Sequence, residues 1–293
     1  MFINVKLYFI KLNFIILKMK NLKIFSLLAI LLVSIITLQS CKDDTITNPP
    51  APDVADTTGL TRIGSNYALG GAALVVLYTD ESGLHTGYNK LYAVLYDSTS
   101  GKIIKDAHVN PYLTDHALGG FAEMPPEFAD AGNRFPFGAV FISPQAVDHW
   151  NIKVGVHNHG HTGEPYGTAS IGSLHIADTP GKFQMKGLAG DTTLYLSYIN
   201  PKAPVTGLNN FEFIINRSKD TLNYKVDTTF TITVKPVLVS SGAASTGNTN
   251  PVVSGTYKHY LGKVNLTAPG TWRINMYMTK PGYSDSTYFE TGF

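Results

Sequence analysis

Segment 150–161 has the clearest alternation of apolar and polar residues in the chain. Its apolar positions are Trp150, Ile152, Val154 and Val156. An alternation with a period of two residues is typical of a β-strand that buries one face. The polar face of this strand leads into His157, His159 and His161. The pattern therefore predicts a strand that ends in three histidines on its solvent-facing side.

Further short strands are predicted from about Gly70 onward. Ala73–Tyr78 and Ala139–Ile142 are continuous apolar runs, and Leu91–Tyr96 alternates. Clusters of Gly, Asn, Asp and Ser separate these segments and favour turns. No long segment after residue 40 shows helical periodicity. The predicted fold class is therefore all-β, built from sandwiches of short strands.

The sequence also repeats itself at an offset of 120 to 125 residues. The matching landmarks are Tyr78 and Tyr198, Asn89 and Asn209, Pro111 and Pro236, and Trp150 and Trp272. Each of the two asparagines lies in a Gly-x-Asn triplet that precedes an alternating strand. A repeat of this length predicts two copies of one domain. We place the copies at residues 65–182 and 183–293.

Residues 1–40 have the pattern of a secretory signal peptide. Lys20 and Lys23 precede an apolar run from Ile24 to Leu38, which is short for a membrane-spanning helix. Met19 stands directly before this pattern and is a second candidate for the true start. Leu38-Gln39-Ser40-Cys41 then resembles the lipobox of bacterial lipoproteins. That resemblance implies cleavage before Cys41 and lipidation of this residue.

The segment after Cys41 is polar and proline-rich, so residues 41–64 are predicted to be the lipidated cysteine and a flexible tether. Lys42-Asp43-Asp44 resembles the tag that follows the lipid cysteine in Bacteroidota lipoproteins and implies surface display. We therefore expect an outer membrane lipoprotein, on either the periplasmic or the surface-exposed face. Its contact with the membrane would be the lipid on Cys41.

Charge and composition exclude several functions. Five lysines and no acidic residues fall in residues 1–40, so residues 41–293 carry a net charge of −3 and offer no basic face for nucleic acid. Cys41 is the only cysteine, which excludes a disulfide within the chain, a thiolate metal site and a Cys nucleophile. The chain has no Gly-x-Ser-x-Gly, His-Glu-x-x-His or phosphate-binding glycine motif. We therefore expect a protein that is not an enzyme.

The order of Gly-x-Asn, strand, proline loop, aromatic strand and Trp strand resembles the YtkA-like (FixH-like) domain. The match is closest at Gly255-Thr256-Tyr257 and at 269–275. The resemblance implies immunoglobulin-like β-sandwiches, and relatives of this family often accompany copper or respiratory-oxidase systems. Family members carry Met and His in the loop after the proline. The first copy retains His116 and Met124 there, and the second copy has neither residue type at this place.

Imidazole is a common ligand for copper and zinc, so the histidines are the candidate metal ligands. The first copy has 25 residues between Trp150 and His175, against 17 between Trp272 and Phe289 in the second. The extra length falls near the histidines, where function tends to reside on a rigid sandwich. We predict a metal site, copper first, with His157 and His159 as ligands. The set would be completed by His161, His175 or His116, with Met124 as a soft ligand for Cu(I).

Other interpretations stay open at this stage. The histidines could form a solvated polar loop or a loop that binds a protein partner. The leading hypothesis is a non-catalytic envelope lipoprotein that binds or presents a metal. The alternative is a structural or interaction lipoprotein with sandwich spacers, including a subunit that joins an envelope protein partner.

Overall fold

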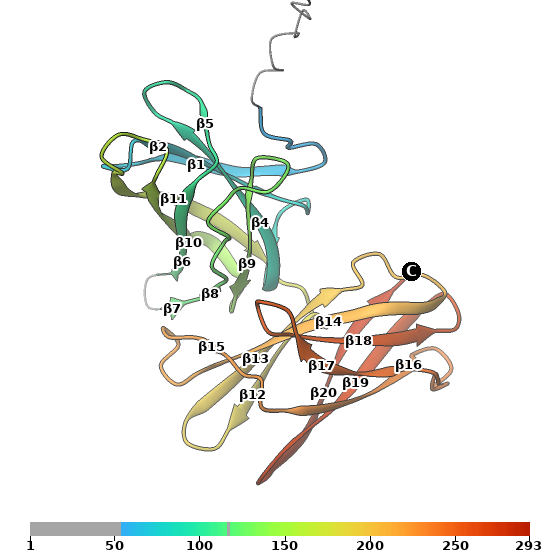
Figure 1. Ribbon diagram of the computed structural model, residues 1–293. Helices are drawn as coiled ribbons and strands as arrows, with labels where there is room; N and C mark the ends of the chain where they lie inside the picture. Colours follow the sequence, from blue (N-terminus) through green and yellow to red (C-terminus); the bar gives the residue numbers. More distant parts are fainter. Residues whose placement is uncertain (1–53, 116–117) are drawn as a thin grey trace, which may run out of the picture. The chain divides into compact units, whose positions relative to one another are not determined.

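The alternating segment around Trp150 forms strand β10 (Gln145–Asn158), inside a sheet of the first copy (Figure 1). The structure is a computed structural model that describes residues 54–115 and 118–293. The signal peptide, Cys41, the start of the tether and His116 lie outside the described residues. Among the described residues, no helix is long and apolar enough to cross a membrane.

Two sheets make up the first sandwich. One has the order β1 (Thr61–Ala68), β2 (Ala73–Thr79), β4 (Gly87–Asp97), β9 (Phe135–Phe141) and β8 (Phe121–Ala122), with β5 (Ile103–Ile104) on β4. The other has the order β3 (Leu84–His85), β11 (Tyr166–Ala177), β10, β6 (Ala107–Asp115) and β7 (Leu118–Gly119). Strand β1 begins within the predicted tether, 41–64, because this stretch pairs with β2 and half-buries Ile63.

The second sandwich repeats the order of the first sheet and keeps three strands of the second sheet. Its first sheet runs β12 (Phe183–Leu188), β13 (Thr192–Asn200), β14 (Gly207–Ser218), β18 (His259–Leu266) and β17 (Thr249–Ser254), with β15 (Lys225–Val226) on β14. Its second sheet runs β16 (Thr231–Leu238), β19 (Thr271–Lys280) and β20 (Tyr283–Gly292). The described residues therefore form two tandem immunoglobulin-like β-sandwiches, and the predicted fold class is confirmed.

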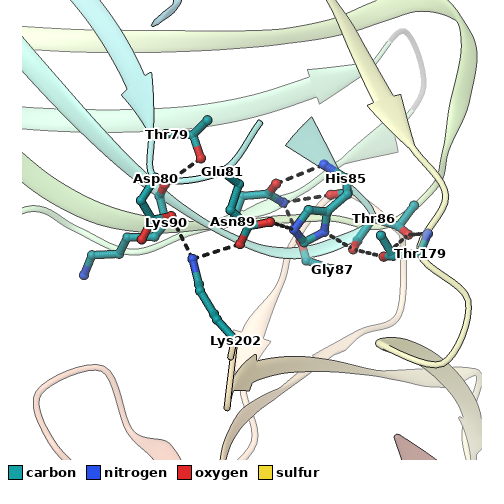
Figure 2. A network of polar contacts seen from close by, with 10 residues as sticks. All are labelled: Thr79, Asp80, Glu81, His85, Thr86, Gly87, Asn89, Lys90, Thr179 and Lys202. Carbon is teal, nitrogen blue, oxygen red and sulfur yellow. Dashed lines mark hydrogen bonds and ion pairs between the residues drawn. The ribbon is translucent and has the colours of Figure 1, made fainter. Parts of the chain in front are cut away.

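The repeated Gly-x-Asn triplet makes the same turn in both copies, and Figure 2 shows the turn of the first copy. Asn89 accepts a hydrogen bond from the N–H of His85 at 2.9 Å and donates to the carbonyls of His85 and Gly87. Asn209 makes the matching three bonds to Val205 and Gly207. Gly87 and Gly207 have φ values of 85° and 105°, a region that favours glycine. The triplet is thus a device that fixes the start of β4 and of β14.

Each sandwich has its own aromatic core. Trp150 and Trp272 are fully buried, as predicted, and each belongs to a separate cluster of buried side chains. The indole N–H of Trp150 donates to the carbonyl of Ser143 at 3.2 Å, and that of Trp272 donates to Ala268 at 2.9 Å. Both buried indole N–H groups therefore have a hydrogen-bond acceptor.

Residues 54–293 form one compact unit, so the two sandwiches contact each other. Tyr195, Ile199 and Ile214 of the second sandwich pack into the buried cluster of the first. At the edge of this contact, Lys202 Nζ pairs with Asp80 Oδ1 at 2.7 Å and with Glu81 Oε1 at 2.8 Å (Figure 2). The contact is thus apolar in part and held by charge at its edge.

Candidate metal centre

Three histidines meet at the end of strands β6 and β10. His108 and His157 are direct cross-strand partners in the antiparallel pairing of these strands. Ile152, Val154 and Val156 are buried, which places the alternate residue His157 on the outer face of the sheet. His159 follows the last residue of β10 and lies beside both imidazoles. Cross-strand pairing and strand alternation together thus bring the three rings to one face.

The rings are close enough for one ion to reach them all. The centroid of His159 lies 4.5 Å from that of His108 and 4.7 Å from that of His157. One nitrogen from each ring lies within 4.8 Å of the others. The shortest of these separations is 3.4 Å, between Nε2 of His159 and Nδ1 of His157.

Each of the three imidazoles also faces a carboxylate. Nδ1 of His159 donates to Oδ1 of Asp106 at 2.8 Å. Nε2 of His108 lies 3.3 Å from Oε1 of Glu127, and Nε2 of His157 lies 3.8 Å from Oε2 of Glu164. Carboxylates in this position orient a metal-binding imidazole and hold the proton on its outer nitrogen. In His159 and His157 the inner nitrogens are then Nε2 and Nδ1, which face each other at 3.4 Å.

Backbone bonds fix the main chain at all three of these acidic residues. Asp106 and Phe128 form an isolated bridge, and the N–H of Ala107 donates to the carbonyl of Glu127 at 3.1 Å. This brings the 127–128 segment against the start of β6. Glu164 lies in the turn between β10 and β11, where its N–H donates to the carbonyl of His161 at 3.0 Å. The acidic residues are therefore held by the fold as well as by the histidines.

The structure separates the other predicted ligands. His161 turns away to Asp97, with 2.8 Å between Nδ1 and Oδ2. The N–H of Ser100 and then His161 hold the pKa of Asp97 at about 2, against the opposing effect of burial. Met124 is exposed and precedes Glu127 by three residues, and its role as a soft ligand stays a prediction.

The register of β11 corrects one expectation. Tyr166, not His175, is the partner of His157, and Leu174 pairs with Trp150 at the other end of the strand. Nine residues of extended strand separate Tyr166 from His175, which is about 30 Å at the usual rise. His175 therefore cannot share an ion with His157.

Sequence reasoning missed His108. The residue lies on the outer face of β6, between the buried Ala107 and Val109. Alternation indicates that it points outward, but only the pairing of β6 with β10 places it next to His157. Asp106 was missed for the same reason, because it directly precedes β6.

A second polar cluster contains one histidine, His259, between two glutamates, and it is unsuited to a metal ion. Nε2 of His259 pairs with Glu123 at 2.6 Å, and Nδ1 pairs with Glu212 at 2.7 Å. Burial would lower the pKa of His259, but the two carboxylates raise it to about 9. Both ring nitrogens then carry protons and donate them, so no lone pair remains for a metal. This cluster is a buried ion-pair contact between the sandwiches.

Comparison with known proteins identifies no family. No family model and no curated protein matches the chain. Among solved structures, domains 5–6 of the S-layer protein SbsC are 7% identical, cover 78% of this chain and 98% of their own, and have a TM-score of 0.29. The Escherichia coli adhesin FdeC is 16% identical, with coverages of 81% and 82% and a TM-score of 0.23. The Yersinia pseudotuberculosis adhesin InvE is 10% identical, with coverages of 83% and 61% and a TM-score of 0.22.

At these scores the likenesses carry no argument about function. The assignment to immunoglobulin-like sandwiches rests on the strand order described above. The resemblance to YtkA-like domains stays a prediction.

Proposed function

We propose that this chain is a non-catalytic envelope lipoprotein that binds one copper or zinc ion through His108, His157 and His159. Anchoring through Cys41 to the outer membrane is part of the proposal and rests on the sequence alone. The function would be to hold or present the ion outside the cytoplasm.

The observation that carries the proposal is that three imidazoles meet and that each has a carboxylate oxygen within 4 Å of a ring nitrogen. Imidazole nitrogen is a preferred donor for copper and zinc. Three such nitrogens converge here, and Asp106, Glu127 and Glu164 face their outer sides. A chance group of surface histidines has no reason to show this division between inner lone pairs and outer carboxylates.

A titration tests the proposal. The full-length chain, stripped of metal with a chelator, is titrated with Cu(II) and with Zn(II), followed by calorimetry. The double variant His157→Ala/His159→Ala should lose binding at least a hundredfold, because two of three ligands are gone. His161→Ala is the matched control, since it removes a histidine of the same turn that pairs with Asp97. Undiminished binding by the double variant, or none by the unmodified chain, would refute the proposal.

The spacer function remains the second candidate, and the contact between the sandwiches favours it. The buried pair of Glu123 and His259 joins residues from the two copies, with apolar packing beside it. A spacer that keeps other parts at a set distance and orientation needs a rigid contact between its domains. The same titration separates the two candidates, because a spacer predicts no metal binding.

A further inference from the structure

We infer that the ion bound at this centre keeps one coordination position open to an exogenous monodentate donor, an inference that rests on the proposed metal binding. The protein supplies three inner nitrogens, and a fourth ligand comes from solution. The centre would thus be a receiving site for a small anion or a neutral nitrogen donor, as well as for the metal.

The first support is the separation of the inner nitrogens. Nε2 of His159 and Nδ1 of His157 lie 3.4 Å apart. A tetrahedral ion with metal–nitrogen bonds of about 2.0–2.1 Å needs its ligands roughly 3.3 Å apart, while adjacent ligands of a square-planar ion need roughly 2.8 Å. The observed separation of this pair is too long for adjacent ligands of a square-planar ion. It fits a tetrahedral ion such as Zn(II) or Cu(I), and also a three-coordinate Cu(I), whose ligands lie roughly 3.5 Å apart and which has room for one further donor. A tetrahedron has four corners, and three are accounted for.

The second support is the position of the carboxylates. Asp106 bonds to Nδ1 of His159, which is the nitrogen on the side of the ring away from His157. Oε1 of Glu127 lies 3.7 Å from that same Nδ1 and 3.3 Å from Nε2 of His108. Glu164 approaches Nε2 of His157, again the outer nitrogen. These oxygens lie next to ring nitrogens other than the pair at 3.4 Å, so they orient the rings from outside.

The third support is that three other histidines of the described residues are engaged elsewhere. His161 bonds to Asp97, His85 bonds to Glu81 and Thr86, and His259 bonds to Glu123 and Glu212. His175 lies at the far end of β11, and the side chain of His108 is 59% exposed. Within the described part of the chain, the fourth corner is therefore left facing solvent. A molecule that takes the ion from this protein would bind to the ion at this position before the three imidazoles release it.

Cobalt(II) spectroscopy tests the inference, because the visible bands of Co(II) report coordination number and ligand exchange. The metal-free full-length chain is loaded with one equivalent of Co(II), and azide and imidazole are then added separately. We expect intense visible bands typical of four-coordination, and a saturable shift of these bands as one donor replaces water. His161→Ala should behave like the unmodified chain.

The outcomes separate this inference from the proposed function. If Co(II) binds, depends on His157 and His159, and shows no shift with either donor, the position is closed and the inference fails while metal binding stands. If no Co(II), Zn(II) or Cu(II) binds, both fail. Asp106→Asn should weaken binding about tenfold to a hundredfold, as expected for an orienting carboxylate. Loss of binding in Asp106→Asn with retention in His157→Ala would place the ion among Asp106, Glu127 and His159 instead, and would overturn the inference.

Discussion

Replacing His259 with glutamine should reduce the free energy of unfolding by about 3 kcal/mol near neutral pH. The pKa of His259 rises from an ordinary 6.5 to about 9 in the folded chain. A shift of about 2.5 units at 1.36 kcal/mol each gives roughly 3 kcal/mol. The range for breaking a buried ion pair, about 3–5 kcal/mol, agrees with this. The loss follows because Glu123, with a side chain only 1% exposed, would lose its cationic partner.

The pH dependence gives the prediction its signature. The folded-state pKa is above the unfolded value, so the stabilisation is complete below about pH 6.5 and is lost as the pH rises through about 9. Other groups that face this imidazole are Tyr88, whose hydroxyl donates to Glu123, and Tyr257. Burial raises the pKa of both tyrosines, so they stay protonated across this window.

Urea unfolding of the full-length chain at about pH 6 and about pH 10 is the assay. The unmodified chain should be about 3 kcal/mol more stable than His259→Gln at the lower pH, and the difference should vanish at the higher pH. His175→Gln, which changes an exposed histidine on β11, is the control and should lower the free energy of unfolding by less than about 1 kcal/mol, as is usual for an exposed contact. A difference between the two proteins that stays constant across pH would show that shape and not charge is responsible, and would refute the reasoning.

Three further predictions concern the cores, a glycine and the anchor. Trp150→Ala and Trp272→Ala should each cost about 3–5 kcal/mol in urea unfolding, because both indoles are fully buried; a loss below about 1 kcal/mol would contradict their role. Gly167→Ala should destabilise strongly, since the added Cβ would collide with the backbone of Gly71 and Leu69, whereas Gly187→Ala meets nothing and should be neutral in thermal unfolding. Cys41→Ser should release the chain from membranes on fractionation, because lipidation is the only predicted anchor; retention after a high-salt wash would argue against it.

Much of the fold could be predicted because it depends on short-range patterns. The alternation around Trp150 follows from one buried sheet face, and the strand it predicts is β10. The Gly-x-Asn triplet repeats because each turn needs a positive φ and an amide that bonds back to the preceding residues. Such signals are local, so they are visible in the sequence before any strand pairing is known.

The candidate site could be predicted only in part because it depends on long-range pairing. His157 and His159 belong to one short segment and could be singled out together. His108 becomes their neighbour through the register of β6 with β10, and Asp106 is 53 residues from His159 in the chain. The same dependence on register explains why His175 was placed too near.

A comparison of His259 with His159 shows why residue type alone does not define a metal site. His259 has a carboxylate at each ring nitrogen, so it is a saturated cation and forms part of an ion pair. His159 has Asp106 at one nitrogen and faces His157 with the other, so its lone pair is directed at a neighbouring ligand. Both residues are histidines beside acids in the folded chain. The partner of the second nitrogen decides whether such a residue stabilises the fold or can hold an ion.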